Sequence, residues 1–189
     1  MRRYACLSSQ IFRDDGREIR PVQDSDIEAI RLWRNAQIDV LRQKQPITAE
    51  SQQSYYERQI WPTMALPQPD NLLVGYLNDG ELIGYGGLVH IAWEHRRAEV
   101  SFLMDPVRAG DDAVYRRDFA LFLQLVKSLA FDDLGLNRIF TETYATRSNH
   151  IAVLEASGFR CEGTMRQHVV IDEKPVDALV HGYLRSYER

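Results

Sequence analysis

The chain has 189 residues, of which 44% are hydrophobic and 26% charged, enough apolar material for one domain around a single core. Its net charge of -4, without a long basic run, argues against nucleic acid as the main ligand. Cys6 and Cys161 lie far apart and have no Cys or His neighbour at metal-ligand spacing, so we expect neither a disulfide nor a metal site. No stretch resembles a membrane span or a secretory signal, which predicts a cytoplasmic protein without a membrane partner.

The N-terminal segment, residues 1–17, ends in the turn signal Asp14-Asp15-Gly16. A short strand pattern follows over residues 17–22, so the segment is either a leading hairpin or a loose tail. We expect residues 18–189 to form one domain.

Two helices are predicted next. Asp24 suits the N-cap of a helix that fades near Asn35, and Thr48 starts a second helix that Pro62 ends. The stretch 61–70 contains three prolines and is predicted to be a loop.

The pattern then changes to strands. Residues 72–77 and 81–91 flank the turn Asn78-Asp79-Gly80, which predicts a hairpin, and residues 97–104 alternate between apolar and polar types as a third strand does. The glycine-rich stretch 84–87 predicts a bulge or a close approach of two backbones.

The second half begins with the longest helical pattern, which Gly135 ends. A strand over 139–144, a short helix that starts at Ser148 or Asn149, and a hairpin of residues 160–171 and 176–184 follow. This order predicts an α/β fold, more specifically α+β, in which helices pack on one layer of sheet.

Several strings of residues resemble signatures of the GNAT superfamily of N-acetyltransferases. NDGELIGYGGL followed by RRAEVSFLM is similar to its hairpin and central strand, and LGLNRIFTETY followed by HIAVLEASGFRCEGTMR is similar to its second half. The resemblance covers residues 18–185. It implies a mixed, mostly antiparallel central sheet flanked by helices, and an acyl-CoA-dependent N-acyltransferase that uses acetyl-CoA as cosubstrate and a small amine as acceptor.

The same resemblance indicates where acetyl-CoA binds. Backbone amides of the central strand, here Phe102, Leu103 and Met104, would contact the pantetheine and stabilise the charge that develops on the thioester carbonyl. The family's glycine-rich pyrophosphate loop is replaced by the longer stretch 107–117, which lacks the second glycine. For Asp111 and Asp112 in this stretch we favour helix capping away from the phosphates.

Five further residues are candidates for contacts with the cofactor, four of them in the stretch 107–117. The three arginines of that stretch are equally open to an interpretation as a solvated face, and the fifth residue stands where the family often has a cofactor-contacting asparagine. In chain order they are Arg108, Gly110, Arg116, Arg117 and Arg147, the last being the asparagine equivalent.

The acceptor amine must lose a proton before it attacks, and Glu99 on the central strand is the first candidate for the base. Its alternative reading is a strand carboxylate paired with a cation such as Arg97, and Glu142 is the second candidate. The tyrosine that commonly protonates the thiolate in this family is Leu154 here. His150 is our candidate for that acid, working with a lowered pKa or as a neutral donor because a helix N-terminus disfavours imidazolium, and Tyr144 is the alternative.

The acceptor itself stays open. Trp33, Arg34 and Asn35 end a helix that walls the acceptor site in this fold, although packing is the better expectation for Trp33. The sequence resembles both acetyltransferases of nucleotide-linked amino sugars and ribosomal-protein N-terminal acetyltransferases, and the loop 61–70 favours the amino sugar because it is long enough to shape a pocket. A non-catalytic acyl-CoA-binding module is the third alternative, and assembly as a homodimer stays open.

Overall fold

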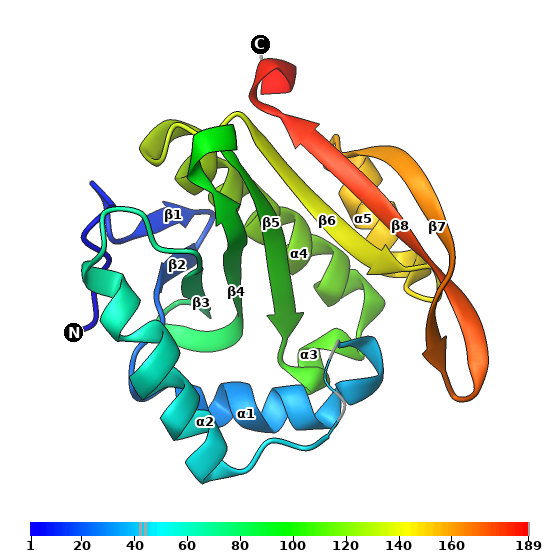
Figure 1. Ribbon diagram of the computed structural model, residues 1–189, viewed down its shortest axis with the longest axis horizontal. Coiled ribbons are helices and arrows are strands. Elements are labelled where there is room, and N and C mark those ends of the chain that lie inside the picture. The colour runs from blue at the N-terminus through cyan, green and yellow to red at the C-terminus, as the bar shows by residue number, and fades with distance from the viewer. Residues whose placement is uncertain (42, 44, 189) are drawn as a thin grey trace.

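A mixed eight-stranded sheet runs through the molecule in the order β1-β2-β3-β4-β5-β6-β8-β7, and the pairing of β5 with β6 is its parallel one (Figure 1). The computed structural model describes residues 1–41, 43 and 45–188. The strands are β1 (Phe12–Asp14), β2 (Arg17–Pro21), β3 (Leu72–Asn78), β4 (Glu81–Ala92), β5 (Arg97–Met104), β6 (Arg138–Tyr144), β7 (Arg160–Ile171) and β8 (Lys174–Leu184).

Helices cover both faces of this sheet. They are α1 (Ile27–Ala36), α2 (Ala49–Tyr55), the single turn α3 (Pro106–Ala109), α4 (Asp112–Lys127) and α5 (Ser148–Ala156), with π-helical turns extending α2 to Ile60 and α4 to Asp133. Short 3-10 turns occupy Ile38–Val40, Pro62–Ala65, Trp93–His95 and Arg185–Glu188.

The alternation along β5 decides which side chain meets which helix layer. Phe102 stacks on Phe119 of α4 with ring centroids 4.7 Å apart, so the side chains of the same parity face α4. Glu99 and Ser101 therefore point to the opposite face, where α1 and α2 lie. On that face Arg34 of α1 reaches the strands and donates a hydrogen bond to the hydroxyl of Tyr85.

The N-terminal segment forms the leading hairpin, because β1 pairs with β2 in antiparallel register. Tyr4 and Leu7, which precede it, are buried in the same hydrophobic core as the sheet. The expected cap at Asp24 is wrong: α1 starts after Asp26, whereas the carboxylate of Asp24 pairs with Arg2.

Two further capping predictions are confirmed. Thr48 accepts a hydrogen bond from the amide of Ser51, and Asp111 accepts from the amides of Ala113 and Val114 at 2.9 and 3.0 Å. The stretch 107–117, which stands in place of the family's pyrophosphate loop, is largely helical, since Pro106 begins the one-turn helix α3 after Asp105 caps it and α4 starts at Asp112.

Glycines 86 and 87 confirm the expected close approach of backbones. A Cβ at Gly86 would lie 2.0 Å from the carbonyl oxygen of Ser101, and a Cβ at Gly87, whose φ is +126°, would lie 2.0 Å from that of Leu72. Strand β4 can therefore pair closely with β5 at Gly86 and with β3 at Gly87 only with glycine at these positions.

Candidate active site

The two central strands part in the middle of the sheet. Pairing of β5 with β6 covers Arg97–Glu99 and ends there in the described chain, whereas β5 stays paired with β4 as far as Met104. Figure 1 shows the two strands diverging toward α3. A cavity of about 190 Å³ opens where they separate, so the β5 backbone beyond Glu99 faces a cleft instead of a strand.

Two carboxylates face this cavity from opposite strands, Glu99 from β5 and Glu142 from β6. Both side chains are largely buried, with 12% and 21% exposed. Glu99 lies 2.9 Å from Nδ1 of the exposed His90, which takes the place of the Arg97 partner considered from the sequence. Glu142 lies 3.6 Å from Nε2 of His168. The arrangement can accept a proton within the cleft and holds a histidine beside each acceptor.

The α4 side of the same cavity has a different character. His150 lines it together with Phe102 and Phe119, and the imidazole stacks on Phe119 with centroids 4.2 Å apart. Its Nδ1 lies 2.6 Å from the hydroxyl of Tyr115, to which Arg147 donates a hydrogen bond at 3.3 Å. This wall brings residues of α4 and α5 into one contact network.

Burial lowers the pKa of His150 well below its ordinary value of 6.5, and the positive charge of Arg147 and the nearby His181 lower it further. The helix N-terminus, from which the sequence predicted this lowered pKa, is not its main cause. His150 is therefore a neutral imidazole at neutral pH.

A second cavity of about 340 Å³ adjoins the first on the α1 and α2 side, and both are lined by Arg34, Val89 and Ser101. Its other described lining residues are three tyrosines, two polar residues and two aliphatic ones: Tyr55, Tyr56, Tyr85, Ser51, Gln52, Ile47 and Leu73. Arg34 is the charged side chain among them. The two cavities therefore adjoin one another through these three shared residues, and the two carboxylates line the first of them.

The comparisons with known proteins agree with this geometry. Residues 19–180 match the model of the acetyltransferase (GNAT) domain family. The chain belongs to the GNAT acetyltransferase family. This membership confirms the predicted family and enzyme class, and the sheet confirms the predicted mixed, mostly antiparallel fold.

Individual relatives support the same GNAT assignment. The chain is 31% identical over 109 residues to an uncharacterised N-acetyltransferase, YoaA, of Bacillus subtilis, a match that covers 57% of this chain and spans only 58% of that protein. The structure is similar to a spermidine N-acetyltransferase from Vibrio cholerae in complex with CoA and spermine, with a TM-score of 0.77, 19% identity, and 92% of this chain and 98% of the other covered. A probable acetyltransferase matches with a TM-score of 0.72, 20% identity and 94% and 98% coverage.

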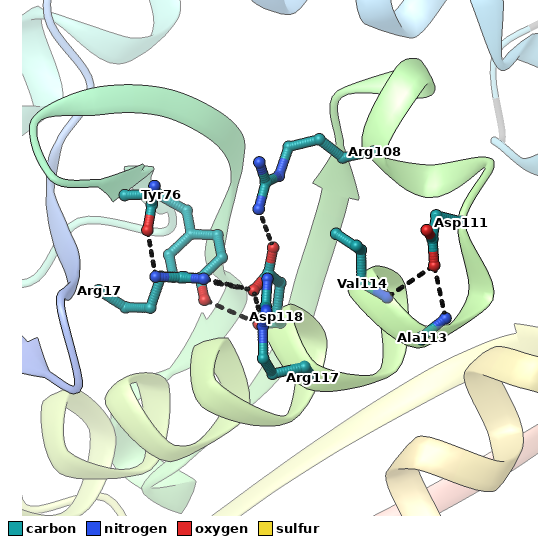
Figure 2. A network of polar contacts seen from close by, with 9 residues as sticks. Arg17, Tyr76, Arg108, Asp111, Ala113, Val114, Arg117 and Asp118 are labelled. Atoms are coloured by element: carbon teal, nitrogen blue, oxygen red, sulfur yellow. Dashed lines mark hydrogen bonds and ion pairs between the residues drawn. The ribbon is translucent and has the colours of Figure 1, made fainter.

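The stretch 107–117, which stands in place of the family's pyrophosphate loop, contains two arginines that pair with a buried carboxylate (Figure 2). Asp118 of α4 is fully buried and pairs with Arg17, Arg108 and Arg117 at 2.9, 2.5 and 3.0 Å. We call these four residues the Asp118 cluster. Burial alone would raise the pKa of Asp118, but the hydrogen bonds from the three arginines outweigh it and lower that pKa. The Asp118 cluster itself therefore combines three positive charges with one negative charge.

The remaining predicted cofactor residues are distributed around this loop. Gly110 ends α3 with an ordinary φ of -72°. Arg116 donates a hydrogen bond to the side chain of Asn149, which in turn donates to Asp112. The carbonyl of Met104 accepts a hydrogen bond from the side chain of Gln37 at 2.8 Å. Leu103, like Met104, is buried beside the cleft, so of these three β5 residues Phe102 lines the cavity itself.

The residues that were predicted to bind the acceptor make different contacts. Arg34 lines both cavities, whereas Asn35 exchanges two hydrogen bonds of 2.8 Å with the backbone of Ile47 and so fixes the segment before α2. Trp33 packs against the core, as preferred from the sequence. Tyr144, the alternative acid, lines the first cavity.

Sequence reasoning missed Tyr115, Phe119, Ser101, Tyr85 and Asp118. The spacing of Tyr115 and Phe119 does put them on one face of a helix, but their meeting with His150 depends on how α4 packs against α5. The expected role of loop 61–70 is wrong, because its residues line neither cavity, and Trp61 and Met64 pack into the core.

Two observations bear on other ligands. No group of three or more His, Cys, Asp or Glu side chains in the described chain is placed to hold a metal ion. None of the helices formed by residues 1–41 and 45–188 combines the length and apolar character that a membrane crossing requires. The cytoplasmic location stays a prediction.

Proposed function

We propose that this protein transfers the acetyl group of acetyl-CoA to the primary amine of a small molecule by direct attack, and that the acceptor class is a nucleotide-linked amino sugar. The observation that carries the proposal is the pair of carboxylates, Glu99 and Glu142, in the cleft between β5 and β6. A primary amine arrives as an ammonium ion, and two carboxylates in a largely buried cleft attract it and accept its proton.

The chemistry follows from the two sides of the cleft. Glu99 removes one proton from the ammonium, and the amine nitrogen forms a bond to the acyl carbon. The bond from that carbon to sulfur breaks, the nitrogen releases its second proton to solvent, and the thiolate takes up a proton from solvent. The β5 backbone beyond Glu99 faces the cleft, where an amide N–H stabilises the charge that develops on the carbonyl oxygen. His90, exposed to solvent and 2.9 Å from Glu99, offers the proton a way out.

The second cavity favours a sugar over a polyamine. Arg34 is its charged lining residue, and its described lining contains no carboxylate that would bind a further ammonium group. Tyrosine rings with Ser51 and Gln52 suit a body with hydroxyl groups, because rings stack on a sugar and polar side chains bond its hydroxyls. A neutral or anionic acceptor body therefore fits beside Arg34 better than a second cation does.

An assay of CoA release with acetyl-CoA and three amines tests the proposal: a nucleotide-linked 4-amino sugar, a peptide with a free N-terminus, and spermidine. We expect the amino sugar to give the highest kcat/KM. Preference for the peptide would identify a protein N-terminal acetyltransferase, and preference for spermidine would make the acceptor a polyamine. No release with any amine, but a measurable heat of acetyl-CoA binding, would identify a non-catalytic acyl-CoA-binding module, and no binding at millimolar concentration would contradict the cosubstrate itself.

Glu99→Gln tests the base. It keeps the size of the side chain and removes its basicity, so we expect turnover to fall about 100-fold, within the range of a positioned base, with little change in acetyl-CoA affinity. Glu94→Gln is the matched control, because Glu94 is an exposed glutamate on the turn before β5. Unchanged turnover in Glu99→Gln would move the role to Glu142 or to water.

A further inference from the structure

Tyr115 holds one side of the imidazole that lines the cleft. We infer that Tyr115 is a positioning residue that fixes His150 in the neutral tautomer with its proton on Nε2, so that the imidazole donates a hydrogen bond to the sulfur of the cosubstrate. The inference rests on the proposed function and adds to it a residue of α4. The sequence offers Leu154, fully buried in the core, where the family commonly carries a tyrosine for this task.

The contacts of the Tyr115 hydroxyl assign the proton. Arg147 lies 3.3 Å away, and a guanidinium has donors only, so the hydroxyl oxygen accepts this bond. The hydroxyl hydrogen then needs an acceptor because Tyr115 is 8% exposed, and among the described residues Nδ1 of His150 is the one within reach, at 2.6 Å. An accepting Nδ1 in a neutral imidazole places the ring proton on Nε2.

The surroundings keep the ring neutral. Three elements present titratable or charged groups to His150: α4 presents Tyr115, the segment before α5 presents Arg147, and β8 presents His181. Burial and the two cationic or basic neighbours lower the pKa of His150, so no proton enters at Nδ1 to compete with the bond from Tyr115.

A neutral donor suits the departure of the thiolate. His150 lines the cavity from the N-terminal turn of α5, on the side of Phe102 and Phe119. As the bond from carbon to sulfur breaks, negative charge develops on sulfur, and a fixed N–H aimed there stabilises it without any change in the charge of the ring. The proton stays on Nε2, and the released thiolate takes its proton from solvent.

Long-range ¹H–¹⁵N correlation of the full-length chain, labelled with ¹⁵N in histidine, reads the tautomer directly. We expect a neutral His150 with Nε2 protonated, assigned by its loss in His150→Gln, and a shift of that Nε2 signal when CoA is added. Tyr115→Phe should convert the resonance to a mixture of both tautomers. A wild-type ring protonated on Nδ1 would overturn the inference even if every variant were unstable.

Kinetics provide the second readout. Tyr115→Phe should lower kcat about tenfold, less than loss of a whole donor costs, and leave the KM for acetyl-CoA within about twofold. Tyr76→Phe is the control, because Tyr76 is a buried tyrosine of β3 whose hydroxyl also contacts α4, at the carbonyl of Asp118, and it is not among the residues that line the cavity. Its kcat should match the wild type.

The outcomes separate the two proposals. Full kcat in Tyr115→Phe contradicts the inference while the proposed function stands. A wild-type chain that acetylates no amine contradicts the proposed function, and the tautomer and its response to CoA, which need no acceptor, then decide the inference alone.

Discussion

Helix α4 takes part in burying two polar groups in opposite ways. Its Tyr115 meets His150, which remains neutral, whereas its Asp118 is fully buried as a carboxylate with three arginines around it. The neighbours are arginines in both cases, so the difference lies in the charge of the ionised group itself, which is positive for His150 and negative for Asp118. His150 has the cation Arg147 beside it, which adds to the effect of burial, whereas the arginines around Asp118 oppose that effect.

The comparison teaches how one helix serves two purposes. Around His150, whose proposed role needs a donor of constant charge, the surroundings suppress ionisation. Around Asp118, whose ion pairs tie α4 to β2 and α3, the surroundings preserve ionisation. The Asp118 cluster holds the helix in place, whereas Tyr115 contacts the side chain of His150, which lines the cavity.

The largest expected effect, on stability, comes from removing the carboxylate of the Asp118 cluster. Asp118→Asn leaves three guanidinium groups without their carboxylate, and loss of one partner from a buried ion pair costs about 3–5 kcal/mol. We expect the melting temperature to fall by roughly 10 °C. Asp15→Asn, an exposed turn residue with positive φ that asparagine tolerates, is the control for thermal denaturation. A change in Asp118→Asn as small as in the control would show that the cluster is not needed for stability.

Removing the imidazole of His150 should lower turnover more than it lowers the stability of the fold. His150→Ala takes away the proposed donor, and we expect kcat to fall roughly 100-fold, or about 2.7 kcal/mol of transition-state stabilisation. Val153→Ala truncates another buried residue of α5 outside the cavity lining and controls for lost packing. Near-normal turnover with a lowered melting temperature would make His150 a packing residue and leave the thiolate to Tyr144 or solvent.

The pH dependence of stability distinguishes the contribution of His150 from that of Asp118. The pKa of His150 is depressed in the folded chain, so below pH 6.5 the unfolded chain binds a proton that the folded chain refuses, and stability falls by up to about 1.4 kcal/mol per pH unit. The depressed pKa of Asp118 acts in a lower window, since its contribution is present above about pH 4 and is lost as the pH falls further.

Melting temperatures measured from pH 8 to pH 5 test this separation. His150→Gln should flatten the slope below pH 6.5, whereas His95→Gln, a change at an exposed histidine, should leave it as in the wild type. An unchanged slope in His150→Gln would assign the effect to other groups.

The smallest effect is expected at the rim of the Asp118 cluster. Arg117 is 54% exposed, and loss of an exposed ion pair costs less than about 1 kcal/mol, because Arg17 and Arg108 still hold the carboxylate. We propose that its charge also serves the phosphates of acetyl-CoA. Arg117→Gln should then raise the KM for acetyl-CoA about threefold at unchanged kcat. Arg166→Gln, on the exposed β7, is the control, and equal KM values in both variants would limit Arg117 to its ion pair.

Much of the fold was accessible from the sequence, because its signals are local. The turn at Asn78-Asp79-Gly80 needs positive φ at Asp79 and Gly80, and the structure has it, and Gly135 and Gly158 end their helices in the same conformation. The cap at Asp24 failed because three acidic or polar residues compete at that helix start, and the long-range partner Arg2 takes the Asp24 carboxylate.

The site was only partly accessible, for a different reason. The strand pattern placed Glu99 and Glu142 on separate strands, but the cleft that joins them depends on where pairing of β5 and β6 stops. For Arg108 and Arg117 the sequence left phosphate binding and a solvated face equally open, and it offered no sign that Asp118 would be buried between them. Contacts between elements far apart in the chain carry no local pattern.

The short pairing of β5 with β6 also divides the sheet mechanically. Strands β1 to β5 form one section and β6 to β8 another, and between them only Arg97–Glu99 are laddered to Arg138–Phe140 in the described chain, whereas β4 and β5 are paired along nearly their whole length. Breathing motions that widen the cleft need to break only this short seam, so it is the softest line of the sheet. A molecule seated in the cleft and touching both sections acts as a clamp across the seam and slows amide hydrogen exchange on both sides of it.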